Sequence, residues 1–110
     1  MSNQVTETQG KLIVSLKGEV DLEHAPTVRR LLLDCVRRRK DILVELAGVA
    51  YIDSSGIASL IEALQAARAQ GTALALVAVS AQAMRVLQLA RLDQVFPIHA
   101  DIAGALRAGA

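Results

Sequence analysis

Two short apolar runs, separated by a helical pattern, constrain the fold of this chain more than any other feature. Asp41–Leu46 (DILVEL) and Ala73–Val79 (ALALVAV) are of strand length and lack the alternation of a strand with one wet face. Runs of this kind are typical of strands buried on both faces of a parallel sheet. Parallel neighbours need a long crossover connection, which is usually right-handed and helical. The sequence therefore predicts an α/β layered domain.

The flanking segments predict the rest of the sheet. Val5–Thr8 and Leu12–Leu16 contain β-prone residues and are joined by a turn at Gln9–Lys11. Gln94–Ile98 is predicted to form a last short strand. We expect a mostly parallel sheet of four to five strands, with an antiparallel edge strand at the N-terminus.

Apolar residues at helical spacing predict about four helices. Pro26 suits the first turn of the first helix, and the second is expected from about Ser55 to a C′ glycine at Gly71. Ser80 and Asp101 are predicted to cap the third helix and a weak terminal helix. The predicted inner faces are Val28, Leu31, Leu32 and Cys35 in the first helix, Ile57, Leu60, Ile61 and Leu64 in the second, and Ala83, Val86, Leu87 and Ala90 in the third.

Composition narrows the classes of function. The 110 residues, 53% of them hydrophobic, suffice for a single domain, residues 1–110, with one modest core. A formal net charge of +1 and an aromatic content of 2% disfavour direct nucleic-acid binding. A basic cluster off the apolar stripe of the first helix has the composition of a nucleic-acid patch, but a solvated helix face is the commoner explanation of such a cluster. Its members are Arg29, Arg30 and Arg37–Arg39.

The lone cysteine and the lack of long apolar segments indicate the compartment. Cys35 has no partner for a disulfide within the chain and is interpreted as a core residue in the reducing cytoplasm. Met1–Gly10 is polar and lacks the features of a signal segment. No run approaches the roughly 18 apolar residues that span a bilayer, so direct membrane insertion is not expected.

Two loops are expected to meet at one edge of the sheet. Glu19–His24 follows Leu12–Leu16, and Gly48–Ser55 follows the strand that ends at Leu46. If these strands are parallel, both loops lie at the carboxyl ends of strands, where ligands and partners of open α/β sheets usually bind.

Within this edge, Tyr51–Gly56 (YIDSSG) is the most unusual local sequence. Asp and Ser are good helix N-caps, because their side-chain oxygens accept backbone N–H groups that otherwise lack partners. A plain helix cap is therefore one interpretation of this stretch. Gly56 would also let a partner or a phosphate approach the backbone closely.

The same residues carry a resemblance to a known family. The YIDSSG stretch followed by Ile57–Leu60 resembles the signature of STAS domains, above all the bacterial anti-sigma factor antagonists. Upstream, Gly18–Asp21 (GEVD) resembles the Gly-Glu-apolar-Asp segment that precedes the first helix of that family. The likeness also covers the order of elements over nearly the whole chain, including a short turn at Ala90–Leu92.

The resemblance implies a function and a set of site residues. The phosphate acceptor of the family corresponds to Ser54, with Asp21, Asp53, Ser55 and Gly56 beside it on the expected partner-binding surface. Family proteins bind an anti-sigma factor when this serine is unmodified and release it on phosphorylation, so they regulate sigma-dependent transcription by partner switching. The anti-sigma factor is typically also the serine kinase, and a metal-dependent serine phosphatase removes the phosphate.

Three of these residues have a second interpretation. Asp53 either orients Ser54 for the kinase or caps the helix. Asp21 is either a contact residue or an ordinary loop acid, with contact slightly favoured. Ser55 is expected to support the cap, although it is the other candidate for modification.

The sequence also bears on other classes of function. The chain has no Gly-x-Ser-x-Gly elbow, phosphate-binding loop or zinc-spaced Cys/His cluster, and His24 and His99 are given no role. We therefore expect no enzyme activity, no cofactor and no metal. A STAS subunit of an ABC-type lipid transport complex has the same fold and is the main alternative. A phosphorylated module that controls secretion or another protein would use the same surface.

Overall fold

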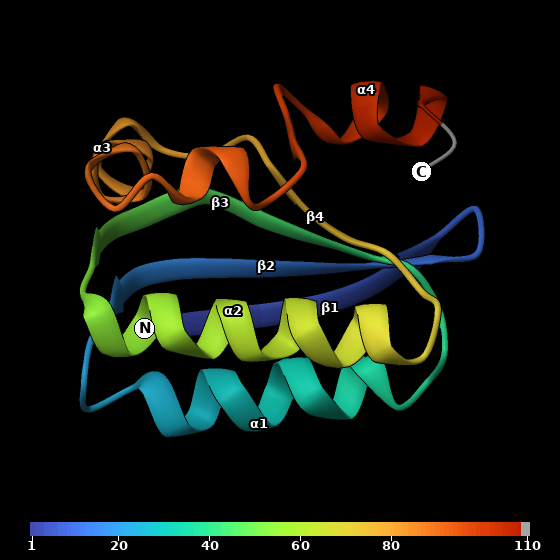
Figure 1. The fold of residues 1–110 in the computed structure, drawn as a ribbon, viewed down its shortest axis with the longest axis horizontal. Coiled ribbons are helices and arrows are strands. Elements are labelled where there is room, and N and C mark those ends of the chain that lie inside the picture. The colour runs from blue at the N-terminus through green and yellow to red at the C-terminus, as the bar shows by residue number, and fades with distance from the viewer. Residues whose placement is uncertain (109–110) are drawn as a thin grey trace.

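The strands follow one another across the sheet in chain order. The computed structural model describes residues 1–108 and places the strands in the order β1-β2-β3-β4-β5 (Figure 1). β1 is antiparallel to β2, and the other neighbours are parallel. This arrangement confirms the predicted α/β fold with its antiparallel N-terminal edge. The strands are β1 (Ser2–Thr8), β2 (Lys11–Val20), β3 (Ile42–Ile52), β4 (Leu74–Val77) and β5 (Ile98–His99).

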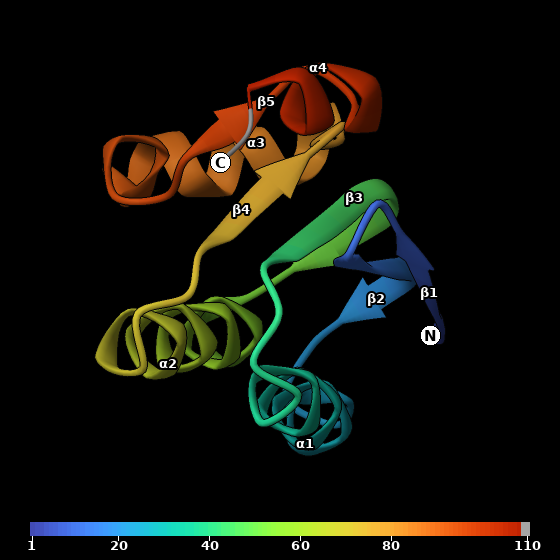
Figure 2. The ribbon, with the colours of Figure 1, turned by 90° about the vertical axis from the view of Figure 1, so that its right-hand side faces the viewer.

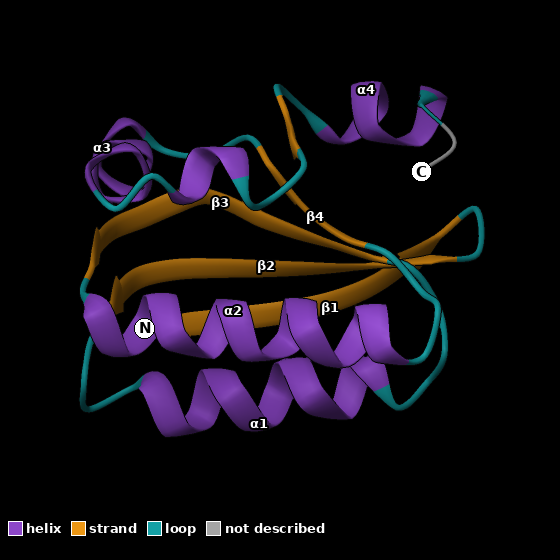
Figure 3. Ribbon diagram, viewed as in Figure 1, coloured by secondary structure: helices purple, strands orange, loops and turns teal. Residues whose placement is uncertain are grey.

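The helices of the described residues lie on two sides of this sheet. α1 and α2 run side by side on one side, whereas α3 and α4 lie on the other (Figures 2 and 3). None of the helices within residues 1–108 is long and apolar enough to cross a bilayer. The helices are α1 (Ala25–Val36), α2 (Ser54–Ala69), α3 (Ala81–Leu89) and α4 (Ile102–Arg107), and Leu92–Gln94 forms a short 3₁₀ turn.

Alternate residues of the central strands point into two apolar clusters. Leu12 and Val14 of β2 belong to the main core, which α1 and α2 complete. Ile13 of β2 and Leu43 of β3 point the other way and join Ala105 of α4 in a smaller cluster. Because side chains alternate along a strand, both faces of the central strands are buried, as the apolar runs predicted.

The predicted inner faces of the helices are confirmed at their centres and differ at their margins. The buried members are Val28, Leu32, Cys35, Ile57, Leu60, Leu64, Ala83 and Leu87, and the half-buried ones are Leu31, Ile61 and Val86. Ala90 is exposed, which corrects its assignment, because α3 ends one residue earlier and Ala90 is the C-cap. Burial raises the pKa of the Cys35 thiol, as expected of a core cysteine.

β2 and β3 are longer than predicted. The sequence placed strands at Leu12–Leu16 and Asp41–Leu46, but the structure extends them to Val20 and Ile52. The added residues pair with each other, with two irregularities of register on the way. Most of the predicted loop Gly48–Ser55 is therefore strand. Mutual pairing satisfies the backbone groups of residues whose side chains give little strand signal.

The C-terminal strand is shorter and later than predicted. Of the predicted Gln94–Ile98, only Ile98 is in a strand, and it pairs together with His99 against the end of β4. The N–H groups of Val95 and Phe96 donate instead to the carbonyl of Leu92. These N–H groups close a turn and therefore cannot donate to a neighbouring strand of the sheet. β1 is instead longer than predicted, because it begins at Ser2 and not at Val5.

Ser80 joins α3 to the free flank of β3. β4 pairs with β3 only as far as Glu45, so among residues 1–108 no strand lies on that side of the later residues of β3. There the Ser80 N–H donates to the Leu46 carbonyl at 3.2 Å, and its hydroxyl donates to the Val49 carbonyl at 2.7 Å. The same hydroxyl oxygen accepts from the Ala83 N–H at 3.2 Å, so the predicted N-cap is confirmed.

The double role of Ser80 gives a stability prediction. Ser80→Ala removes the cap of α3 and the donor to Val49, so we expect the free energy of unfolding to fall by about 1–2 kcal/mol. Urea denaturation followed by circular dichroism measures it. Gln82→Ala, at an exposed position of the same helix, is the matched control and should change stability little. Equal stability of the two variants would contradict the role assigned to Ser80.

Candidate functional site

The two predicted loops meet at the carboxyl ends of β2 and β3. The Asp53 N–H donates to the Val20 carbonyl at 3.3 Å. In return, the Leu22 N–H donates to Asp53 Oδ2 at 3.1 Å. The segment before α1 and the segment before α2 are thus joined directly, as the parallel arrangement of the strands predicted.

Asp53 is the N-cap of α2. Its Oδ1 accepts from the backbone N–H groups of Ser55 at 3.0 Å and Gly56 at 3.1 Å, and from the Ser55 hydroxyl at 2.5 Å. The Ser55 hydroxyl and these N–H groups, together with the Leu22 N–H, hold the pKa of Asp53 below its ordinary value of 3.8. Of the two predicted roles of Asp53, the structure shows the cap.

The two serines of the motif lie in different environments. Ser54 is the first residue of α2 and is exposed, and within residues 1–108 its hydroxyl makes no hydrogen bond. Ser55 is half-buried, and its hydroxyl donates to Asp53. An anion on Ser54 would lie at a helix N-terminus, where the unpaired N–H groups and the helix dipole favour negative charge.

Gly56 is a packing residue. It is buried in the first turn of α2, and a Cβ at this position would lie 2.4 Å from the Val20 carbonyl oxygen and 2.8 Å from Cγ1 of Ile52. The sequence predicts that the bare backbone of Gly56 lets a partner or a phosphate approach closely. On the side where a Cβ would lie, the end of β2 in the same chain already occupies that space. A contact of Gly56 with a partner stays a prediction.

Asp21 organises the loop before α1. Its Oδ1 accepts from the His24 backbone N–H at 3.2 Å and lies 2.6 Å from Nδ1 of the His24 ring. Desolvation opposes the ionised form, but the hydrogen bonds from His24 outweigh it and lower the pKa of Asp21. Asp21, Glu23 and His24 bring possible metal-ligand atoms within 4.8 Å of one another. Two of these three already pair together, and exposed acidic loops are common without a metal.

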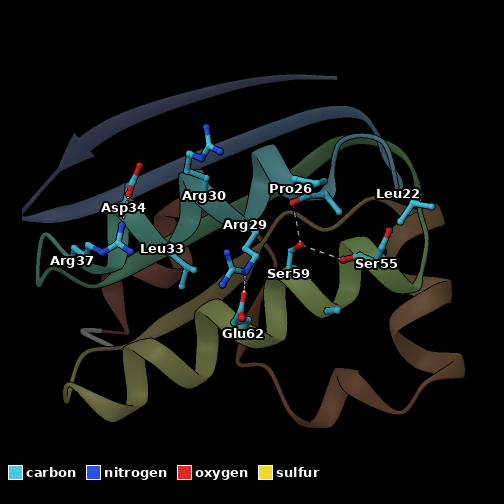
Figure 4. A pocket seen from close by; sticks show the side chains of 12 residues that line it. Leu22, Pro26, Arg29, Arg30, Leu33, Asp34, Arg37, Ser55, Ser59 and Glu62 are labelled. Carbon is cyan, nitrogen blue, oxygen red and sulfur yellow. Dashed lines mark hydrogen bonds and ion pairs between the residues drawn. The ribbon is translucent and has the colours of Figure 1, made fainter.

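A groove between α1 and α2 begins beside Ser55 (Figure 4). Its volume is about 780 Å³. Ser59 closes part of its floor, because its hydroxyl lies 3.3 Å from the Ala25 carbonyl and 3.1 Å from the Ser55 carbonyl. An ion pair between Arg29 and Glu62 crosses it. The lining residues are Leu22, Ala25, Pro26, Arg29, Arg30, Leu33, Asp34, Arg37, Ser55, Ala58, Ser59 and Glu62.

Two exposed apolar residues at this edge were not predicted. Leu22 is 74% exposed beside the cap of α2, and Tyr51 is 51% exposed near the end of β3. Single exposed apolar side chains are common on protein surfaces, so their position at this edge, and not their exposure alone, makes them candidates for a partner contact. Leu22 lies between two acidic residues, Asp21 and Glu23, and this apolar position in a polar segment could have been predicted as exposed from the sequence. The exposure of Tyr51 was not predicted, because this residue was considered only as part of the motif Tyr51–Gly56.

The domain can now be placed in a family. A model of the STAS domain matches residues 2–105, which is nearly the whole chain. The chain belongs to the STAS domain family. Asp53, Ser55 and Gly56, from the motif that carries most of the sequence resemblance, build the junction of β3 and α2.

Two relatives are similar to this STAS domain over most of their length. The anti-sigma-B factor antagonist of Bacillus subtilis (strain 168) is 25% identical over 103 residues, which are 94% of each chain. The anti-sigma F factor antagonist of Paenibacillus polymyxa is 28% identical over 100 residues, which are 89% of this chain and 86% of that protein.

Solved structures show the same fold. The crystal structure of an anti-sigma factor antagonist from Mycobacterium paratuberculosis is 25% identical, with a TM-score of 0.89 over 97% of this chain and 92% of that one. Bacillus SpoIIAA shares the fold at 18% identity. The structure of its unphosphorylated form has a TM-score of 0.80 and covers 96% of this chain and 93% of SpoIIAA. The structure of its phosphorylated form has a TM-score of 0.76 and covers 99% of this chain and 100% of SpoIIAA.

The packing of Gly56 gives a prediction that opposes helix propensity. Alanine is about 1 kcal/mol better than glycine inside a helix, but the Cβ of Gly56→Ala would overlap the Val20 carbonyl. We expect a net loss of roughly 1–3 kcal/mol in the free energy of unfolding, measured by urea denaturation. Ala58→Gly, at an exposed position of the same helix, is the control and reports propensity alone. A Gly56→Ala variant as stable as the natural STAS domain would disprove the close contact.

The cap at Asp53 predicts a pH dependence of stability. Because the folded-state pKa of Asp53 lies below the ordinary 3.8, its charge stabilises the fold fully above that value and progressively less as pH falls through the folded pKa. Asp53→Asn keeps the oxygen that caps α2 and removes the charge. It also replaces Oδ2, which accepts from the Leu22 N–H, by an NH₂ group, and this second loss does not depend on pH.

Thermal melts of both proteins between pH 7 and pH 2 test this prediction. We expect the melting temperature of Asp53→Asn to lie a few degrees lower at neutral pH, and the difference to shrink below about pH 4. A difference that stays constant over this range would show that the charge of Asp53 contributes nothing.

Proposed function

We propose that this STAS domain is an anti-sigma factor antagonist that works by partner switching. In the unmodified state it binds an anti-sigma factor that is also a serine kinase. Phosphorylation of Ser54 releases this partner, and a metal-dependent serine phosphatase restores binding. The chain acts in the cytoplasm as a binding module, with no catalytic step of its own. The names of the two relatives and the sequence motifs support this assignment.

The observation that carries the proposal is the state of the Ser54 hydroxyl. It is exposed and makes no hydrogen bond within the described residues, and the capping of the helix is done by Asp53. A kinase can therefore transfer a phosphoryl group to Ser54 Oγ without breaking an interaction of the fold. Ser55 is a poorer acceptor, because its hydroxyl is held by Asp53 at 2.5 Å.

The charge of the surrounding edge explains how the phosphate would act. A phosphoserine carries about −1.5 to −2 charges at neutral pH. The edge already holds Asp53 and Asp21, whose lowered pKa values keep them ionised at neutral pH. The helix N-terminus tolerates the added anion, so the fold persists. The partner instead faces a more negative and more strongly hydrated surface, which weakens binding.

The contact surface proposed here is centred on Ser54. Asp21 and Asp53 flank it, Ser55 lies at its margin, and the exposed side chain of Leu22 offers an apolar contact close to the cap. Apolar groups at the centre of an interface typically contribute more binding energy than charges at its rim. In this arrangement, Leu22 contributes affinity and the charge on residue 54 decides whether the complex forms.

A binding experiment with variants of Ser54 tests the proposal. The natural protein, Ser54→Ala, Ser54→Asp and Ser55→Ala are immobilised and incubated with lysate of the native host, and the bound proteins are identified by mass. We expect a serine kinase to be retained by the natural protein, Ser54→Ala and Ser55→Ala, and to be lost, by at least tenfold, with Ser54→Asp. The captured kinase, given ATP, should place one phosphate on Ser54.

Three outcomes would count against the proposal. Retention of the kinase by Ser54→Asp would show that charge at residue 54 does not control binding. A phosphate mapped to Ser55 would move the switch by one residue. Recovery of a permease and an ATPase, indifferent to residue 54, would instead assign the chain to a lipid transport complex.

A further inference from the structure

β1 leaves one edge of the sheet open. It is the outermost strand, and β2 is its neighbour in the sheet (Figure 2). Within residues 1–108, no backbone hydrogen bond is made on its outer side. The opposite edge is formed by β5, which has only two residues. The long free edge of this sheet is therefore that of β1.

The β1 edge lacks the features that usually prevent strand pairing. Natural proteins protect an edge with proline, lysine, a bulge or a very short strand. β1 has seven residues, SNQVTET, with neither proline nor lysine. Its register with β2 runs without a shift from Ser2 to Thr8, whereas β2 and β3 show register shifts. The edge is thus regular and able to accept another strand.

The turn after β1 determines which of its residues face outward. Gln9 and Gly10 have φ values of 52° and 77°, as in a type I′ two-residue turn, which makes Thr8 and Lys11 a hydrogen-bonded pair. Such pairs alternate with non-hydrogen-bonded pairs along an antiparallel ladder. In the remainder of β1, the outward N–H and C=O groups therefore belong to Asn3, Val5 and Glu7.

We propose that β1 pairs antiparallel with β1 of a second copy of this chain, with a two-fold axis at Val5. The three outward residues are symmetric about Val5, so Val5 faces Val5 and Asn3 faces Glu7 at both ends. Every outward backbone group of these residues then finds a partner. The two sheets become one continuous sheet across the dimer.

The charges of the edge favour a second copy. Glu7 is the one charged residue of β1. Like charges directly opposite each other destabilise a strand pair, but in this register each Glu7 faces a neutral Asn3. Glu7 is also held by Lys40 at 2.7 Å and by Arg38 at 3.5 Å, both in the turn that follows α1. The symmetric pairing therefore brings no charge repulsion to the edge.

The proposed dimer is independent of the switch at Ser54. In an antiparallel pair, the carboxyl ends of β2 in the two copies point in opposite directions. The two Ser54 sites therefore lie at opposite ends of the joined sheet. A failure of the dimer leaves the partner-switching proposal intact, and the reverse also holds.

Sedimentation velocity over a concentration series of the purified chain tests the pairing and its register. The natural protein should shift from monomer to dimer as its concentration rises to the millimolar range. Asn3→Lys places a positive charge opposite Glu7 and should lower the dissociation constant several-fold. Asn3→Glu places like charges opposite each other and should raise it several-fold. Gln4→Lys and Gln4→Glu, which face Thr6 in the partner, are the controls and should have much smaller effects.

A second variant tests the backbone contact itself. Val5→Pro removes an outward N–H on the two-fold axis but no hydrogen bond to β2, and edge strands tolerate such prolines. We expect it to be monomeric at every concentration. The Asn3 variants decide the question if Val5→Pro does not fold, because Asn3 is exposed. A natural protein that stays monomeric, or Asn3 variants that all associate like it, would overturn the proposal.

Discussion

The carboxylate of Asp53 is the interaction on which the functional edge depends. It lies directly after the last residue of β3 and accepts hydrogen bonds from the start of α2 and from the backbone of Leu22. One side chain therefore fixes the end of a strand, the start of a helix and the loop before α1. A helix N-terminus needs acceptors in any case. Here that general need also brings together segments about 30 residues apart in sequence.

The close contact at Gly56 completes this junction. Asp53 sets the first turn of α2 by hydrogen bonding, and the missing side chain at Gly56 lets that turn rest on the Val20 carbonyl. An Asp followed three residues later by a Gly thus has a structural basis, because the cap and the close approach both need the same turn. The exposed Ser54 between them is excluded from both tasks, which leaves its hydroxyl available.

Much of the fold could be predicted from the sequence, because its signals are local. The apolar runs of β3 and β4 and the stripes of α1 and α2 follow from the periods of strands and helices. The extents of strands could not be predicted in the same way. β3 continues to Ile52 because β2 runs beside it. Gln94–Phe96 forms no strand because, in the register that pairs Leu76 with Ile98, it would lie beside residues 72–74, where β4 is only beginning. These are properties of neighbours that no window of sequence contains.

The site shows the same division between local and tertiary information. Ser54 and the cap at Asp53 were within reach of the sequence, since both belong to one short motif. The exposure of Leu22, the pairing of Asp21 with His24 and the burial of Gly56 all depend on how the loop before α1 lies against α2.

The lack of any hydrogen bond to the Ser54 hydroxyl within the described residues has a consequence for evolution. A position that supports no contact of the fold can be exchanged, lost or regained at no structural cost. Selection on regulation and selection on folding therefore act on separate residues, and a lineage could abandon the control while keeping the scaffold.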